Sequence, residues 1–307
     1  MSVYNLNGVS IDDIYSIESI SLPNAYDVNG NLVFDGKPHS YLADYSDYEY
    51  SQKWASKGVA STQGFDIYDD KVFWVSKSGN GSIPANCYVW NLADGSQAFD
   101  DAYVTVYSGH GNNLCFDFPT LYATSAYTPH VYINSVTNDY EFSLIKTLYI
   151  NDGCIDCDAC IDENDKNILW TLGHTAASSD TSAPYYISKW DLTQLINNGD
   201  GTFTPRKIKT IETAQPANSF FFQGVKSHDG LLWYANGYSG SGTGAYVYGV
   251  DPDTGTVVFT IDCNTTAEPE GVAWVEDVSV PGGYALYVGF QGMMLRKYTF
   301  AELQSQE

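Results

Sequence analysis

Residues 223–261, with the sequence QGVKSHDGLLWYANGYSGSGTGAYVYGVDPDTGTVVFTI, decide the fold. Four apolar runs follow one another here, and segments rich in Gly, Asp and Ser separate them. Short runs rich in Val, Tyr, Phe and Trp are typical of β-strands, while Asp-Gly and Asp-Pro-Asp-Thr-Gly are typical of tight turns. The segment therefore predicts an antiparallel meander of four strands.

The same order of features occurs five times along the chain. Each copy opens with a residue that precedes or begins an apolar strand, and these leading residues are Gln63, Asn112, Cys157, Gln223 and Glu270. Their spacings are 49, 45, 66 and 47 residues, which lie in the range of the repeats of β-propellers. The long third interval contains residues 173–183 and 197–201, both predicted to be loops between strands.

The sequence thus predicts an all-β fold: a five-bladed β-propeller over residues 37–307, with an N-terminal β-hairpin arm over residues 1–36. The last copy reaches only a third strand, at 294–300, so we expect residues 41–54 to supply the fourth. Pairing of the N- and C-terminal strands would close the ring and remove exposed edges.

The arm contains a short repeat, Tyr4–Ile11 and Tyr26–Val33, and each copy has an Asn-Gly pair between apolar residues. Asn-Gly favours the type I′ turn of a two-residue hairpin. Because an isolated hairpin is only marginally stable, the arm is either a frayed terminus or packs on the propeller, on another protomer or on a larger assembly.

Composition excludes several classes of function. The chain has 14 Lys and Arg against 37 Asp and Glu, a net charge of −23 and a pI of about 4.2, so it lacks the cations that nucleic-acid binding needs. No apolar run is long enough to insert into a membrane, and the first 30 residues do not have the pattern of a signal peptide. A soluble protein is expected, released by lysis, carried on a phage particle or located at a cell surface.

The leading residues of the inner strands are expected to face one mouth of a propeller channel. Polar groups that converge there would form a ligand site. With rim and loop residues added, the predicted ligand-binding set is Gln63, His110, Asn112, Asp158, Gln223, Glu270, His174 and Tyr238. The alternative is that these side chains only satisfy backbone groups where the strands crowd together.

Catalysis is the second functional alternative. A glycoside hydrolase needs two carboxyl groups that flank the scissile bond, and only Glu270 with Asp156 or Asp158 qualifies by position. The first repeat has Gln63 where a third acid would be expected, and alternation predicts that Asp66 points outward. The acidic set is incomplete, and we therefore assign no catalytic residue.

Cys154, Cys157 and Cys160 have the spacing that begins some zinc and iron–sulfur motifs. A fourth ligand is missing, and three-residue steps in a strand send side chains to opposite faces. We expect buried thiols, with no metal and no cofactor.

Two stretches, Thr62–Phe65 and His110–Asn113 leading into Phe118–Tyr122, resemble five-bladed propellers of phage and prophage receptor-binding tail proteins and of gut-bacterial surface proteins. The Tyr-Asp-Val-Asn-Gly repeat of the arm is similar to arms of prophage tail proteins. The resemblance implies recognition of a cell-surface glycan. A glycoside hydrolase or lyase, and a scaffold that assembles through residues 1–36 as a homo-oligomer or in a larger complex, are the alternatives.

Overall fold

The computed structural model describes residues 25–26, 32–34, 62–76, 84–99, 103–125, 128–175, 184–213, 222–237, 244–279 and 283–298. The chain divides into two units, residues 1–39 with 301–307 and residues 40–300. In the first unit, β1 (Ala25–Tyr26) and β2 (Leu32–Phe34) pair antiparallel, at the second Asn-Gly repeat. The first repeat and the predicted closing strand at 41–54 lie outside the described residues.

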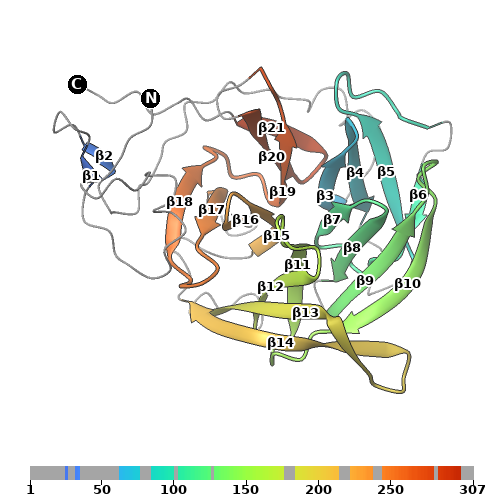
Figure 1. Cartoon of the computed structure of the whole chain (residues 1–307). Coiled ribbons are helices and arrows are strands. Elements are labelled where there is room, and N and C mark those ends of the chain that lie inside the picture. Colours follow the sequence, from blue (N-terminus) through green and yellow to red (C-terminus); the bar gives the residue numbers. More distant parts are fainter. Residues whose placement is uncertain are drawn as a thin grey trace. The chain divides into compact units, whose positions relative to one another are not determined.

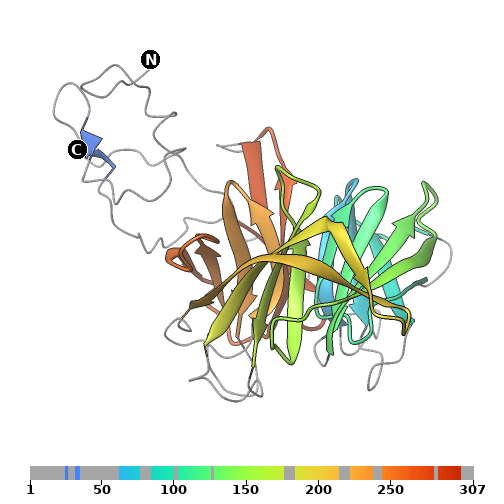
Figure 2. The ribbon, with the colours of Figure 1, turned by 60° about the horizontal axis from the view of Figure 1, so that its bottom comes forward.

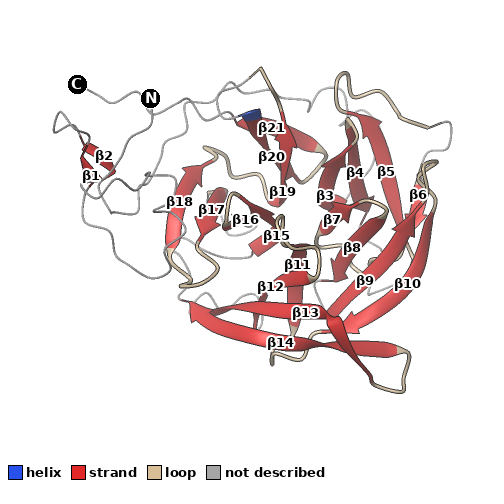
Figure 3. Ribbon diagram, viewed as in Figure 1, coloured by secondary structure: helices blue, strands red, loops and turns tan. Residues whose placement is uncertain are grey.

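The described part of the second unit consists almost entirely of strands and loops (Figure 3). Three of its sheets follow chain order, so each is a simple antiparallel meander. They comprise β3 (Thr62–Tyr68), β4 (Lys71–Ser76), β5 (Ala85–Asn91) and β6 (Val104–Val106); β15 (Phe222–His228), β16 (Leu231–Asn236), β17 (Tyr246–Val250) and β18 (Val257–Asp262); and β19 (Pro269–Glu276), β20 (Tyr284–Phe290) and β21 (Met294–Tyr298).

The fourth sheet has eight strands and departs from the expectation of one sheet for each repeat. It joins two meanders: β7 (Leu114–Asp117), β8 (Thr120–Ser125), β9 (Thr128–Val136) and β10 (Phe142–Tyr149) with β11 (Asp156–Ile161), β12 (Ile168–His174), β13 (Tyr185–Asn197) and β14 (Thr202–Thr213). Thr147 and Leu148 of β10 pair in parallel with Thr202 and Phe203 of β14. The junction arises because β13 and β14, with 13 and 12 residues, are long enough to reach the neighbouring meander (Figure 2).

The first strands of the meanders lie innermost, and β6, β10, β14 and β18 lie outermost (Figure 1). Apolar clusters fill the spaces between successive sheets. Phe73 of the first sheet packs with Leu121 of the next, and Trp233 of β16 packs with Leu286 of β20. Another cluster joins Phe65 of the first sheet to Tyr287 of the last. The fold is therefore propeller-like, with sheets packed face to face around an axis.

No helix in the described ranges has the length and hydropathy that crossing a membrane requires.

Candidate functional site

The segments that begin the inner strands approach one another closely around the axis. A Cβ on Gly64 would lie 2.7 Å from backbone atoms of Asn112, and one on Gly224 would lie 2.7 Å from the Cα of Gly271. Gly271 in turn borders the Phe65 ring. Only a residue without a side chain allows backbones to come this close, which explains the Gln-Gly and Glu-Gly pairs that open three of the repeats.

Asp158 completes this cycle of contacts by joining three segments through its carboxylate. Oδ1 accepts hydrogen bonds from Asn112 Nδ2 at 2.8 Å and from Thr124 Oγ1 at 3.0 Å, and Oδ2 accepts one from the Gly224 backbone N–H at 2.7 Å. Burial of this side chain raises its pKa to about 6, although the three donors oppose the shift. Asp158 thus holds β11 to the segment before β7 and to β15.

Asn113 makes a second connection across the axis. Its Nδ2 donates to the carbonyl oxygens of Ala159 at 2.8 Å and Val225 at 3.2 Å. The two consecutive amides, Asn112 and Asn113, therefore link the second meander to both the third and the fourth. Neither Asn113 nor Thr124 belongs to the ligand-binding set predicted from the sequence, and no signal in the sequence identified Thr124.

Gln223 and Glu268 form a further polar pair at the end of the axis where the inner strands begin. Gln223 Nε2 donates to Glu268 Oε1 at 3.1 Å, and each residue retains slight exposure, at 5% and 9%. Gln223 Oε1 has no hydrogen-bond partner. Glu268 was missed because Glu270, two residues later, was taken to open the strand; Glu270 is fully buried.

The two histidines of the predicted set are also buried. His110 lies in the turn before β7, where its backbone N–H donates to Ser125 Oγ. His174 ends β12, and its ring centroid lies 5.1 Å from that of Phe222 and 6.4 Å from that of Tyr185. The backbone of Asp156 pairs with that of His174, so this histidine belongs to the same end of the axis.

The prediction that Asp66 points outward is wrong, because its side chain is buried. Its Oδ2 accepts from the Phe116 backbone N–H at 2.7 Å and forms an ion pair with Lys226 Nζ, and both side chains are buried. Burial raises the pKa of Asp66, while Lys226 and the backbone donors oppose that shift. The strand β3 contacts both β7 and β19, so neither of its faces meets solvent and alternation does not separate inside from outside.

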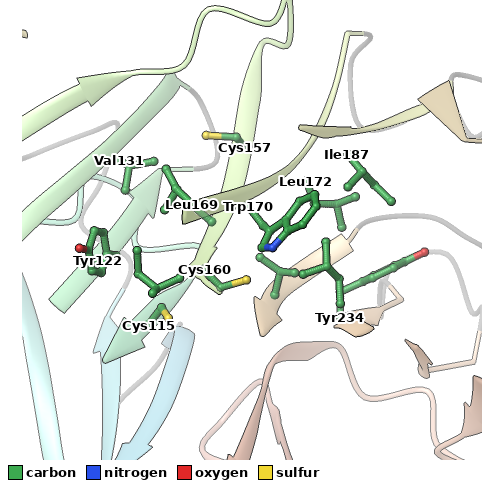
Figure 4. Packing of buried hydrophobic residues seen from close by; sticks show 14 of the residues in the cluster. Cys115, Tyr122, Val131, Cys157, Cys160, Leu169, Trp170, Leu172, Ile187 and Tyr234 are labelled. Carbon is green, nitrogen blue, oxygen red and sulfur yellow. The ribbon is translucent and has the colours of Figure 1, made fainter. Parts of the chain in front are cut away.

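All six cysteines are buried thiols outside any disulfide, and burial was expected for those of the Cys154–Cys160 cluster. Cys157 and Cys160 point to opposite sides of β11 within an apolar cluster (Figure 4). Burial raises the pKa of Cys160 well above its ordinary value, which favours the protonated thiol. Across the described ranges, no three His, Cys, Asp or Glu side chains converge to hold a metal ion.

Two members of the predicted set, Asn112 and Asp158, bond to each other. A third, Gln223, bonds to Glu268, which was not predicted. Gln63 lies with the strand start of β3, where its Nε2 donates to the Thr62 carbonyl at 3.2 Å. Tyr238 and the side chain of Asp156 lie outside what the structure describes.

No protein-family model matches the sequence, and no curated protein matches it. Among solved structures, the chain is similar to a glutaminyl cyclase of Myxococcus xanthus, with 15% identity over 85% of this chain and 97% of the other, at a TM-score of 0.54. It also matches a tail fiber of Staphylococcus aureus phage P68, with 13% identity over 80% of this chain and 50% of the other, at 0.43.

A third similarity is to the WD40 β-propeller domain of Doa1, with 13% identity over 78% of this chain and 79% of the other, at a TM-score of 0.40. At these identities the similarities concern the fold alone. That fold is all-β and propeller-like.

Proposed function

We propose that the second unit is a five-bladed propeller that recognises a cell-surface glycan at the end of the axis where its inner strands begin. The count of five blades is supported by five successive meanders, of which the last has three described strands. It is also supported by the cycle of contacts that runs from Gly64 through Asn112, Asp158 and Gly224 to Gly271 and back to Phe65.

The observation that carries the proposed function is the Gln223–Glu268 pair. It brings an amide and a carboxylate together where β15 and β19 begin, and it leaves the buried Gln223 Oε1 without a hydrogen-bond partner. Sugar hydroxyls both donate and accept hydrogen bonds, so an amide and a carboxylate suit them. Gln63, His110 and His174 complete the proposed ligand-binding set, and Asn112 and Asp158 hold it in place.

The biological setting that we propose is a phage or prophage receptor-binding module. The support for it is the sequence resemblance of residues 62–65, 110–113 and 118–122 to receptor-binding propellers of phages. In this setting the protein is carried on a virion or displayed outside a cell, and it binds its glycan without cleaving it.

A glycan array probed with the purified chain tests the proposal. We expect binding of an intact glycan, and we expect Gln223→Ala to weaken it about tenfold or more, because the amide proposed to bond the sugar is removed. Gln97→Ala is the matched control, since that glutamine donates to Phe99 O away from the axis. No binding by the native chain, or equal losses in both variants, would reject the axial site.

Acid–base catalysis is the second candidate, and one observation favours it. Asp158 is a buried carboxyl with a pKa of about 6, Glu268 and Glu270 are two further buried acids where β19 begins, and perturbed carboxyls are common in active sites. A similar fold is found in the M. xanthus glutaminyl cyclase, an enzyme. A glycoside hydrolase or lyase would release products from the array hits, detectable by mass spectrometry, and Glu270→Gln would abolish that release.

The scaffold alternative rests on the N-terminal arm. The paired strands β1 and β2 belong to a unit of their own. If residues 1–36 drive assembly, their deletion changes the mass measured by light scattering and leaves the propeller folded. An unchanged mass would leave the arm without a role in oligomerisation.

A further inference from the structure

The outer hairpin β13–β14 contains a groove that the axial site does not use. The pairing shifts between Asp191, opposite Arg206, and Leu195, opposite Pro205, so residues 192–194 bulge without counterparts on β14. Proline fits this position because it has no N–H to donate to the ladder. The hollow beside the bulge has a volume of about 420 Å³, within the range of about 300–1,000 Å³ typical of small-molecule sites.

Hydrogen bonds fix the shape of the bulge. Asp191 Oδ1 accepts from the Thr193 backbone N–H at 2.8 Å, and its Oδ2 accepts from Arg206 Nη2 at 2.8 Å. Trp190, at the floor, is held by its indole N–H, which donates to Thr171 Oγ1 at 2.9 Å. The groove is therefore formed before any ligand arrives, which lowers the entropic cost of binding.

The charge of this region is opposite to that of the chain. The strands β10, β13 and β14 carry five of the 14 cationic residues and only two acids, Asp191 and Glu212, in a protein of net charge −23. Lys207 is exposed, lies 5.4 Å from the Trp190 ring centroid, and makes no ion pair with another described residue. Arg206 is 55% exposed and engages Asp191 through Nη2, so its other donors can reach a ligand.

Neutral and apolar groups complete the groove. Asn151, Gln194 and Thr204 supply amide and hydroxyl groups along its edges, and the aliphatic side chains of Leu195, Ile196 and Pro205 form a wall. This combination matches a sugar ring, which has hydroxyls at its rim and C–H groups on its faces. The cations add a requirement for negative charge.

We propose that this groove binds a carboxylate-bearing sugar, a uronate unit of an acidic polysaccharide, with Lys207 and Arg206 engaging the carboxylate. Arginine and lysine form strong charge-assisted hydrogen bonds with carboxylates. The site is separate from the axial site, and neither requires the other.

Titration calorimetry of the full chain with trigalacturonate tests this site, and maltotriose is the neutral comparison. We expect trigalacturonate to bind more tightly than maltotriose, with an affinity that falls as salt increases. Lys207→Gln should weaken binding about tenfold, because a charge-assisted hydrogen bond is lost. Lys166→Gln removes the same charge from the β11–β12 turn, where the lysine pairs with Asp117 at 3.1 Å, and should leave binding unchanged.

Four results would overturn the proposal: no binding of trigalacturonate, equal binding of maltotriose, equal binding of inorganic phosphate, or equal losses in Lys207→Gln and Lys166→Gln. Gln223→Ala distinguishes this site from the axial one. It should leave trigalacturonate binding intact even where glycan binding at the axis fails. Circular dichroism of each variant shows that the comparison is made between folded proteins.

Discussion

The axis and the outer hairpin β13–β14 place polar side chains in opposite environments. Around the axis, Asp158 has three donors and Asp66 has an ion pair and backbone donors, all buried. On the hairpin, Lys207 lies in solvent and Arg206 has a single acidic partner. Satisfied buried polar groups hold sheets together, whereas exposed ones with spare bonding capacity are available to ligands.

Substitutions can therefore measure the effects on stability and on ligand binding separately. Changes at the axis should cost stability, and changes at the hairpin should cost binding with little effect on stability. The Gln223–Glu268 pair shares features of the axis and of the hairpin. It is buried like the axial groups, yet Gln223 Oε1 has no hydrogen-bond partner.

Lys226→Met should have the largest effect. It leaves the Asp66 carboxylate buried without its cation, and removal of one partner from a buried ion pair costs about 3–5 kcal/mol. Urea denaturation measures the loss. The double variant Asp66→Asn/Lys226→Met removes the stranded charge and should recover part of the stability; a double variant less stable than the single one would show that the charge is not the cause.

Asp158→Ala should have the next largest effect and lower the free energy of unfolding by about 3 kcal/mol or more. It leaves donors of Asn112, Thr124 and Gly224 buried without an acceptor. The same denaturation experiment applies. Thr124→Val removes only one of these donors and should cost less than Asp158→Ala. If the two variants lose equal stability, the carboxylate does not join the three segments.

The change of stability with pH that Asp158 causes should be smaller than the loss in Asp158→Ala. An ion-paired carboxylate usually loses its stabilising contribution as the pH falls, whereas Asp158 should lose its contribution as the pH rises. Burial raises the pKa of Asp158 to about 6, so between about pH 4 and 6 the folded chain binds more protons than the unfolded chain. The stability contributed by this group is complete below pH 4 and is lost as the pH rises through 6. Thermal unfolding of the native chain and Asp158→Asn at several pH values should show a difference that follows this titration; a constant difference would contradict it.

Lys207→Gln should have the smallest effect on stability, within about 0.5 kcal/mol, because Lys207 is exposed and makes no ion pair with another described residue. The same variant is expected to have a large effect on trigalacturonate binding. A destabilisation similar to that of Lys226→Met would remove the contrast between hairpin and axis.

Much of the fold could be predicted because its signals are local. Apolar runs, Asp-Gly turns and Gln-Gly strand starts gave strands at the expected positions, including β15–β18 over residues 222–262. The parallel pairing of Thr147 with Thr202 could not be predicted. It depends on how far β13 and β14 extend, and sequence patterns define the ends of strands poorly.

The candidate site was predicted less completely. Gln223 was identified because it leads its repeat, and Asp158 because it follows the leading residue of the third repeat. Thr124 and Glu268 were missed because their roles depend on contacts between sheets, and Asp66 was placed outside because alternation assumes one solvent face. Register shifts at Thr62–Phe65 and Gln223–Val225 further disturb the alternation on which such predictions rest.

The two residue pairs that join β10 to β14 also bear on how the molecule opens. They connect residues 147–148 with 202–203, so that β7–β10 and β11–β14 share one hydrogen-bonded ladder. Regions that share a ladder tend to open together, and their amide protons then exchange with solvent at a common rate. The strands β7–β14 should therefore behave as one exchange unit, while β15–β18, with a ladder of its own, can open independently.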